Sequence, residues 1–427
     1  MIPFRILWHY FCARNRHFSR RDKLERYQQK QLKRFAHGVL AKSPWFSAFA
    51  TQPFNSWPLM DKSSMMRNFD VMNTQSLSGR ELFNCALLSE KDRDFSRTIG
   101  KFSAGLSSGT SGQRGLFVVS REEQQLWAGS MLAKMLPDGL FSGEKVALFL
   151  RANNNLYQTV NNRWLSLEFY DLFKPIISHF GSLQQQSPTI IVAPAQVLRE
   201  LALCVLRGEV ELQVKQVISV AEVLDHQDRL LLKHIFGKVA EIYQATEGFL
   251  ASTCSHGTLH LNEEFLHIEP QWIDERRFTP IVTDFTRTTQ PVVRYKLDDV
   301  LVASLEVCPC GNAARAISQI EGRWDDQLRL PDGEGTLKIV FADLCSRILA
   351  ISLPATADYR LIQEDERRLT LIADCTAEEL ESCKQALQNL FDEQGIDIHS
   401  LSWKLESEAV TPQFDSKRRR IIRKAEK

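Results

Sequence analysis

The stretch PTIIVAPAQVLRELALCVLRGEVELQVKQVISVAEVLDHQDRLLLKHIF, residues 188–236, indicates the fold class of this chain. It contains two short runs of apolar and β-branched residues, at 188–194 and 214–220, each followed by a longer segment with helical patterning. A third run of this kind, EKVALFL, lies at 144–150. Short strands that alternate with helices are typical of a mostly parallel sheet covered by helices. We therefore predict an α/β fold.

The pattern changes after residues 322–326. Residues 358–375 are typical of two strands, 377–395 of an amphipathic helix and 401–410 of a further strand. Together they make a small α+β unit of about a hundred residues. We predict a large N-terminal domain with mixed, mostly parallel sheets over residues 1–322. A small, mobile α+β domain is predicted over residues 323–427.

Composition excludes several classes of protein. The formal net charge of the 427-residue chain is +1, so no overall field favours binding to nucleic acid or to a membrane surface. No apolar run is long enough to span a bilayer, and the apolar residues near the start are interrupted by charges. Nine cysteines, an odd number scattered along the chain, favour a reducing compartment over a disulfide framework. We expect a cytoplasmic protein with neither a nucleic-acid nor a membrane partner.

The segment KFSAGLSSGTSGQRGLFVVS, residues 101–120, carries a dense run of hydroxyl and glycine residues. Glycine lets the backbone turn its N–H groups inward and hydroxyls add donors, so this composition suits a phosphate-binding loop. It equally suits a flexible linker, because the Gly-Lys-Ser/Thr ending of a P-loop and the GxGxxG pattern are both missing. The run consists of Ser107, Ser108, Gly109, Thr110, Ser111 and Gly112.

Four further motifs follow this loop along the chain. They are YQATEG at 243–248, RYKLDD at 294–299, GRWDD at 322–326 and TPQFDSKRRRIIRK at 411–424. In this order and spacing they resemble the adenylate-forming superfamily of acyl- and aryl-CoA ligases, luciferases and peptide-synthetase adenylation domains. The nearest likeness is to the phenylacetate-CoA ligase-like branch and to adenylate-forming proteins of secondary-metabolite clusters. That likeness rests on SPWF (43–46), WPLMDKSSMMRNFD (57–70), ISVAEVL (218–224) and CPCGN (308–312).

The resemblance implies that a carboxylate attacks the α-phosphorus of ATP and expels pyrophosphate. Positioning and charge stabilisation would dominate such a step. The implied catalytic residues are Lys417, Thr246 and Glu247, with Glu247 also holding Mg²⁺. The implied ATP-binding residues are the loop from Ser107 to Gly112, together with Ala221, Glu222, Tyr243, Gln244, Asp299 and Arg323.

Individual residues have other interpretations. Asp299 would otherwise form an ion pair with Arg294, and the basic run that contains Lys417 would otherwise be a solvated or polyanion-binding tail. The chain also departs from the family pattern at Gln244 and Asp298, where glycine is usual. These departures motivate an alternative in which the protein binds a nucleotide or acyl-adenylate without catalysing a reaction.

A metal site is predicted from CPCG and an upstream segment, STCSHGTLH. Cys308 and Cys310 are separated by one residue, a shorter spacing than that of most zinc motifs. Cys254 and His260, the latter preferred over His256, would complete a tetrahedral structural zinc site. Proteins of the resembled branch carry such a site in this region. The alternative is a group of cysteines that bind no metal.

The resemblance favours an aromatic acid as substrate. CoA, a carrier protein, a reductase partner or another nucleophile would accept the acyl group, and a homodimer is possible. We expect the acid pocket near residues 157–180 and the loop at 243–248. The candidate walls are Trp164, Phe169, Tyr170 and Phe173, although aromatic residues are more often plain core.

Overall fold

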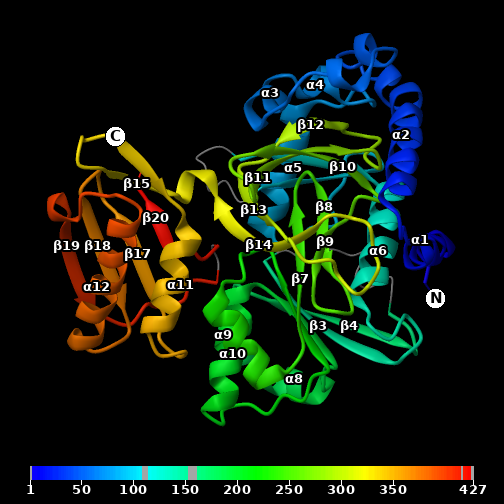
Figure 1. Ribbon diagram of the computed structural model, residues 1–427. Helices are drawn as coiled ribbons and strands as arrows, with labels where there is room; N and C mark the ends of the chain where they lie inside the picture. Colours follow the sequence, from blue (N-terminus) through cyan, green and yellow to red (C-terminus); the bar gives the residue numbers. More distant parts are fainter. Residues whose placement is uncertain (1, 108–113, 152–160, 415–416, 425–427) are drawn as a thin grey trace.

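The computed structural model describes residues 2–107, 114–151, 161–414 and 417–424. Twelve strands in these ranges form one sheet (Figure 1), in the order β10-β11-β13-β14-β9-β8-β7-β6-β5-β3-β4, with β12 paired to β11. The bounds of its strands are β3 Glu144–Leu150, β4 Leu165–Asp171, β5 Ile190–Ala193, β6 Gln216–Val220, β7 Val239–Ala245, β8 Gly248–Thr253, β9 Leu259–Leu261, β10 Leu266–Trp272, β11 Arg277–Asp284, β12 Val292–Lys296, β13 Asp299–Ala303 and β14 Ala316–Arg323.

Strands β3 to β7 form the parallel half of the sheet. Alternate residues of β3 enter two different cores, Val146 and Leu148 on one face and Ala147 and Phe149 on the other. Helix α6 (Arg121–Met135) covers the first face, and α9 (Ala195–Leu206) and α10 (His226–Phe236) cover the second. Burial on both faces explains the nearly continuous apolar runs of these strands. The predicted α/β fold, a mixed sheet flanked by helices, is confirmed.

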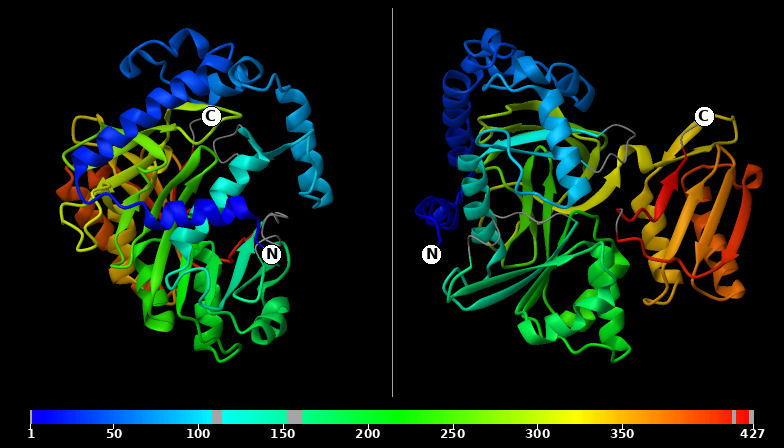
Figure 2. Two further views of the ribbon diagram at one scale, coloured as in Figure 1. Left: turned by 90° about the vertical axis from the view of Figure 1, so that its right-hand side faces the viewer. Right: turned by 180° about the vertical axis from the view of Figure 1, so that it is seen from behind.

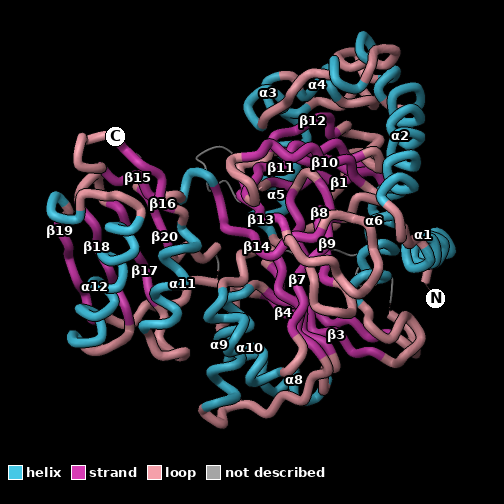
Figure 3. Tube along the Cα trace, viewed as in Figure 1, coloured by secondary structure: helices cyan, strands magenta, loops and turns pink. Residues whose placement is uncertain are grey.

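Beyond β7 the strand pairings are antiparallel, a feature that the sequence analysis did not bring out. Several connections here are short, such as residues 254–258 between β8 and β9 and residues 273–276 between β10 and β11. A short connection can join only antiparallel strands, because a parallel pair needs a crossover of a dozen or more residues. Figure 3 shows the two halves as one continuous strand layer.

The N-terminal helices pack against the antiparallel half and α6. Helix α1 (Phe4–Asn15) approaches α6 at Gly129, where an added Cβ would lie 2.6 Å from the carbonyl oxygen of Ile6. No helix in the described ranges combines the length and hydropathy of a transmembrane span. The remaining helices before β14 are α2 Arg21–Gly38, α3 Lys62–Arg67, α4 Phe69–Met72, α5 Gly79–Asp92 and α8 Phe180–Gln186, with 3₁₀ turns η1 Leu40–Lys42, η2 Ser47–Phe49, η3 Phe54–Ser56 and η4 Ile176–His179.

Residues 328–423 enclose a separate hydrophobic core. They lie to one side of the large sheet in Figure 1 and in the right view of Figure 2, and the chain enters them from β14. The four-stranded sheet has the order β19-β18-β17-β20, beside a two-stranded ribbon. The elements are η5 Trp324–Asp326, β15 Leu328–Pro331, β16 Leu337–Val340, α11 Ala342–Ser352, β17 Tyr359–Gln363, β18 Arg368–Ala373, α12 Ala377–Glu393, η6 Ile398–Ser400, β19 Ser402–Ser407 and β20 Ile421–Arg423.

Candidate active site

A cavity of about 1330 Å³ lies at the carboxyl ends of β3, β6 and β7. This edge is where open α/β sheets bind their ligands. The cavity brings together side chains that are far apart in the sequence, such as Ser107 and Lys417, which are separated by 310 positions. Every described ATP-site residue of the sequence analysis lines it, namely Ser107, Ala221, Glu222, Tyr243, Gln244, Thr246, Glu247, Asp299, Arg323 and Lys417. Ser108, Gly109, Thr110, Ser111 and Gly112 lie outside the described residues.

Strands β1 (Phe102–Leu106) and β2 (Leu116–Ser120) form an antiparallel hairpin that brings the two ends of the predicted phosphate loop together. The Ser107 N–H donates to the Gly115 carbonyl at 2.8 Å, and the Gly115 N–H donates to Ser107 Oγ at 2.7 Å. Arg114 donates to the Ser107 carbonyl at 2.9 Å and pairs through two hydrogen bonds with Glu90 on α5. The base of the loop is therefore anchored at the cavity rim.

Tyr243 and Asp299 meet at one wall of the cavity. The buried Tyr243 hydroxyl donates to Asp299 Oδ2 at 2.5 Å. Asp299 begins β13 opposite Arg323 on β14. The alternative ion pair between Asp299 and Arg294 does not form, because both oxygens of Glu269 accept from Arg294 at 2.9 Å. Among the described residues, Asp299 thus keeps one oxygen that can accept from a ligand hydroxyl.

Thr246 and Glu247 lie in the tight connection between β7 and β8. The Thr246 hydroxyl donates to Glu247 Oε2 at 2.8 Å, and Arg287 donates to the Thr246 carbonyl at 2.9 Å. Burial, followed by the adjacent Glu247 charge, raises the pKa of Tyr295. Glu247 lines the cavity, and a carboxylate oxygen is the donor type that Mg²⁺ prefers.

Several cations line the same cavity, among them Lys62, Arg323 and Lys417. Burial and then the charge of Arg323 lower the pKa of both lysines. Among the described residues, Lys417 makes neither a hydrogen bond nor an ion pair. Cations that repel one another inside a cavity favour a polyanionic ligand. Lys62 was not among the predicted site residues, although the segment that carries it, 57–70, was part of the family resemblance.

Ala221 and Glu222 follow β6 at the cavity, and they differ in their contacts. Ala221 has φ of 65°, a left-handed conformation that is uncommon for a residue with a Cβ and that clusters at functional sites. The Glu222 side chain is turned away from solvent and accepts from Arg151 at 3.0 Å and from Gln196 at 2.9 Å. Glu222 is thus engaged with protein groups, while the backbone at Ala221 borders the cavity.

The loop at 243–248, which was expected beside the acid pocket, lines this cavity, but the four aromatic residues expected as its walls do not. Among the described residues, the cavity is not lined by Trp164, Phe169, Tyr170 or Phe173. These residues lie on or beside β4, which is the edge strand, and Tyr170 stacks on Phe149 inside the second core. Aromatic and polar side chains from other elements line the cavity instead, namely Phe117, Gln124, Trp127, Ser130, Phe249 and Phe265.

The cysteines of the predicted metal site come together away from this cavity. The ligand atoms of Cys254, His260, Cys308 and Cys310 all lie within 4.8 Å of one another. Two Sγ atoms, of Cys254 and Cys308, are 3.6 Å apart, and Cys310 Sγ is 3.4 Å from His260 Nε2. Ligands about 2.3 Å from a tetrahedral zinc ion would be about 3.5–3.8 Å apart, so the spacing fits.

Contacts of His260 and Cys308 also suit a metal, although burial raises the pKa of the Cys310 thiol to about 11. His260 Nδ1 lies 3.0 Å from the Ala314 carbonyl, and a proton donated there leaves Nε2 as the ligand atom. Burial opposes ionisation of Cys308, but its hydrogen bonds with Thr258, Cys310 and His260 lower the pKa of the thiol to about 6. A thiolate is the form that binds zinc.

Comparison with known proteins establishes the fold. No family profile and no curated protein matches this sequence. Among solved structures, 2-hydroxyisobutyryl-CoA ligase in the postadenylation state with 2-HIB-AMP matches with a TM-score of 0.64 at 14% identity, over 94% of this chain and 88% of that one. Its open conformation with 2-HIB-AMP and CoA matches with a TM-score of 0.55 at 15% identity, over 93% and 90%.

A second similar structure is the anthranilate CoA ligase AuaEII in complex with anthranoyl-AMP. It matches with a TM-score of 0.52 at 12% identity, over 74% of this chain and 65% of the ligase. The chain therefore has the fold of the adenylate-forming enzymes.

Proposed function

We propose that this protein activates a carboxylic acid with ATP, forming an acyl-adenylate and releasing pyrophosphate, and then transfers the acyl group to an acceptor. The observation that carries the proposal is the meeting of Lys62, Arg323 and Lys417 with the carboxylate of Glu247 around one cavity. A polyanion and the negative charge that develops as it reacts would be stabilised there. The fold shared with the two CoA ligases is consistent with this chemistry.

Each residue has a role that its position supports. Lys417 would neutralise charge on the attacking carboxylate and the α-phosphate, and Thr246 would donate to the α-phosphate. Asp299, oriented by Tyr243, would accept from ribose hydroxyls, while Arg323 would contact ribose or phosphate. The loop that begins at Ser107 would hold the departing phosphates. Glu247 would hold Mg²⁺, which supplies positive charge against the phosphates.

We propose that residues 323–427 form a small domain that moves about Asp325 and Asp326, relative to a large domain of residues 1–322. Lys417 reaches the cavity in the arrangement described here. The TM-score is higher for the postadenylation state of 2-hydroxyisobutyryl-CoA ligase, 0.64, than for its open conformation, 0.55. The present arrangement would therefore be the one that performs adenylation.

The acid is proposed to be aromatic, within a phenylacetate-CoA ligase-like activity. Phe117, Trp127, Phe249 and Phe265 supply rings around the part of the cavity that would hold it. CoA is the first acceptor to test, and a carrier-protein thiol, an amine or a reductase partner would also attack the same activated carbonyl.

The experiment that tests the proposal is acid-dependent exchange of labelled pyrophosphate into ATP, with a panel of aromatic and aliphatic acids. At least one acid is expected to support exchange, and Glu247→Ala is expected to lower its rate about 100-fold or more. A well-folded protein that binds ATP but exchanges with no acid would favour the alternative of a non-catalytic adenylate-binding protein. Gln244, which is exposed at the cavity where the family has glycine, motivates that alternative.

Lys417 predicts a pH dependence for exchange. Burial, together with Arg323, lowers its pKa below the ordinary lysine value of 10.5. Because the protonated amine is the form that neutralises charge, kcat/KM for ATP should fall as the pH rises through this lowered pKa. Lys417→Arg should lose the alkaline fall, since a guanidinium stays charged to about pH 12. The same fall in both proteins would assign it to another group.

We also propose that Cys254, His260, Cys308 and Cys310 hold one structural zinc ion. Three thiolates and one imidazole form a closed tetrahedral set, and such sites stabilise a fold rather than catalyse a reaction. The ion would tie the β8–β9 turn and β9 to the loop between β13 and β14.

A further inference from the structure

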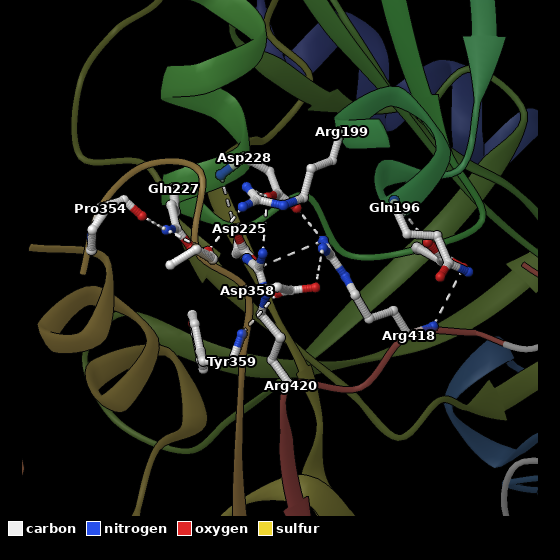
Figure 4. Close-up of polar contacts among 12 residues, drawn as sticks. Gln196, Arg199, Asp225, Gln227, Asp228, Pro354, Asp358, Tyr359, Arg418 and Arg420 are labelled. Carbon is white, nitrogen blue, oxygen red and sulfur yellow. Dashed lines mark hydrogen bonds and ion pairs between the residues drawn. The ribbon is translucent and has the colours of Figure 1, made fainter. Parts of the chain in front are cut away.

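A buried group of arginines and aspartates joins the tail that carries Lys417 to α9 and α10 (Figure 4). Asp228 on α10 is at its centre, and its side chain is fully buried. Asp228 Oδ1 accepts from Arg199 and from Arg420, each at 3.0 Å, and Asp228 Oδ2 accepts from Arg418. Asp225 and Asp358 complete the group, each pairing with Arg420.

The charges of this group balance only when the two parts of the chain meet. One part contributes Arg199 on α9, Asp225 at the N-cap of α10 and Asp228 within α10. The formal charges of these three residues add up to −1. Asp358, Arg418 and Arg420 precede β17 and β20, and their formal sum is +1. Each part alone carries an unbalanced charge, and removing one partner of a buried ion pair is strongly unfavourable, so the intact group favours contact between the tail and α10.

Arg418 makes its shortest side-chain contact across this boundary. It pairs with Asp228 and lies 3.9 Å from Asp225, whereas its contact within its own unit, to Asp358, is at 3.6 Å. Arg420 differs, because it also bonds Asp358 at 2.7 Å and lies over the Tyr359 ring. Separation of the two parts would thus leave Arg420 partly paired but deprive Arg418 of Asp228.

The tail is held on both sides of Lys417. Before it, Arg151 donates to the Phe414 carbonyl at 2.9 Å. After it, the Arg418 N–H donates to Glu222, which also pairs with Arg151. These contacts direct the intervening Lys417 side chain, which makes no bond of its own among the described residues, into the cavity.

We propose that Arg418 and Asp228 are positioning residues for adenylation: their buried ion pair fixes the tail against α10 so that Lys417 reaches the reacting groups. The expected effect on adenylation rests on the proposed function, but the placement of Lys417 can be tested without assuming that function. The pair serves only the arrangement in which the tail lies on α10. Its loss should therefore slow adenylation and leave transfer from a preformed adenylate unaffected.

The test compares Arg418→Gln and Arg418→Lys with a matched control, Arg423→Gln, which changes an arginine of the same tail that makes no ion pair among the described residues. Arg418→Gln is expected to slow pyrophosphate exchange roughly 100-fold. Consumption of a chemically prepared acyl-adenylate should stay within about threefold, and Arg418→Lys should recover part of the exchange rate. A parallel loss in both half-reactions, or no loss in either, would overturn the proposal.

A chemical footprint tests the placement independently of activity. Acetylation of Lys417 by a small reagent, followed by mass spectrometry, should be roughly tenfold faster in Arg418→Gln than in the wild-type chain. The exposed Lys424 should react equally in both, and the Arg423→Gln protein should match wild type. An unchanged Lys417 rate would refute the positioning role even if exchange is active. A raised acetylation rate of Lys417 in a protein that exchanges with no acid would refute the proposed function alone.

If Arg418→Gln does not fold, Asp228→Asn serves with the same readouts.

Discussion

Replacing Lys417 by alanine is expected to reduce acid-dependent pyrophosphate exchange by about 100- to 1000-fold. The reason is electrostatic: Lys417 is a largely buried cation without a bonding partner among the described residues, and it lines the same cavity as Glu247. Within a water-excluded site, a fixed positive charge stabilises the negative charge that develops on transferring oxygens. The measurement is the exchange rate at saturating ATP with the best acid of the panel.

Lys424→Ala is the matched control, because Lys424 lies in the same basic tail but is exposed and pairs with Glu364. Its exchange rate should equal that of wild type. Equal losses in the two variants would support the interpretation of this segment as a general polyanion-binding tail. ATP affinity should change far less than the rate in Lys417→Ala, because the charge acts mainly as the reaction proceeds.

Removing zinc is expected to have the second large effect. The purified protein should contain about one zinc ion per chain, and a strong chelator should lower the melting temperature by roughly 5–10 °C. The four proposed ligand atoms lie within 4.8 Å of one another, so an ion held by all of them would add directly to the folding free energy. Metal analysis and thermal unfolding check both statements.

Cys308→Ser should lose the zinc and reproduce the melting temperature of the chelated protein. Cys85→Ser, which changes a cysteine on α5 outside the group, should keep both zinc and stability. Protein that was never exposed to a chelator and yet contains no zinc would contradict the assignment. So would a melting temperature that is the same with and without chelator.

The residues with distinctive chemistry were predictable from the sequence. Thr246, Glu247, Asp299, Arg323 and Lys417 stand in short motifs whose order is retained, and the structure places all of them around one cavity. Motifs of this kind mark sharp turns and strand ends, where a side chain is held by local backbone. That is why Glu247 and Asp299 could be placed without knowing the sheet order.

Residues whose position depends on distant packing could not be predicted. Glu222 lines the cavity as expected, but its carboxylate also accepts from Arg151 and from Gln196, partners that only the folded sheet brings near. The acid walls were expected on β4 because it is rich in aromatic residues, whereas β4 is the sheet edge and α6 supplies Trp127 to the cavity. The hydrophobic pattern of a sequence predicts that a side chain is buried, but it does not predict which core that side chain enters.

The antiparallel half of the sheet illustrates the same limit. Strand β9 has only three residues, Leu259–Leu261, and its pairing with both β8 and β14 depends on contacts far along the chain. Local propensity is weak over so short a run. The same strand carries His260. Its role as a zinc ligand was predicted from the presence of Cys308 and Cys310 in the chain and not from the pattern of the strand.

The most direct test of the central claim follows an oxygen atom. A carboxylic acid that supports exchange is prepared with a heavy oxygen isotope in its carboxylate and is turned over with ATP and an acceptor. If the carboxylate oxygen attacks the α-phosphorus, that oxygen stays on phosphorus when the acceptor takes the acyl group. We predict that the released AMP carries one labelled oxygen, as seen by mass spectrometry. Unlabelled AMP, or label in inorganic phosphate, would contradict formation of an acyl-adenylate.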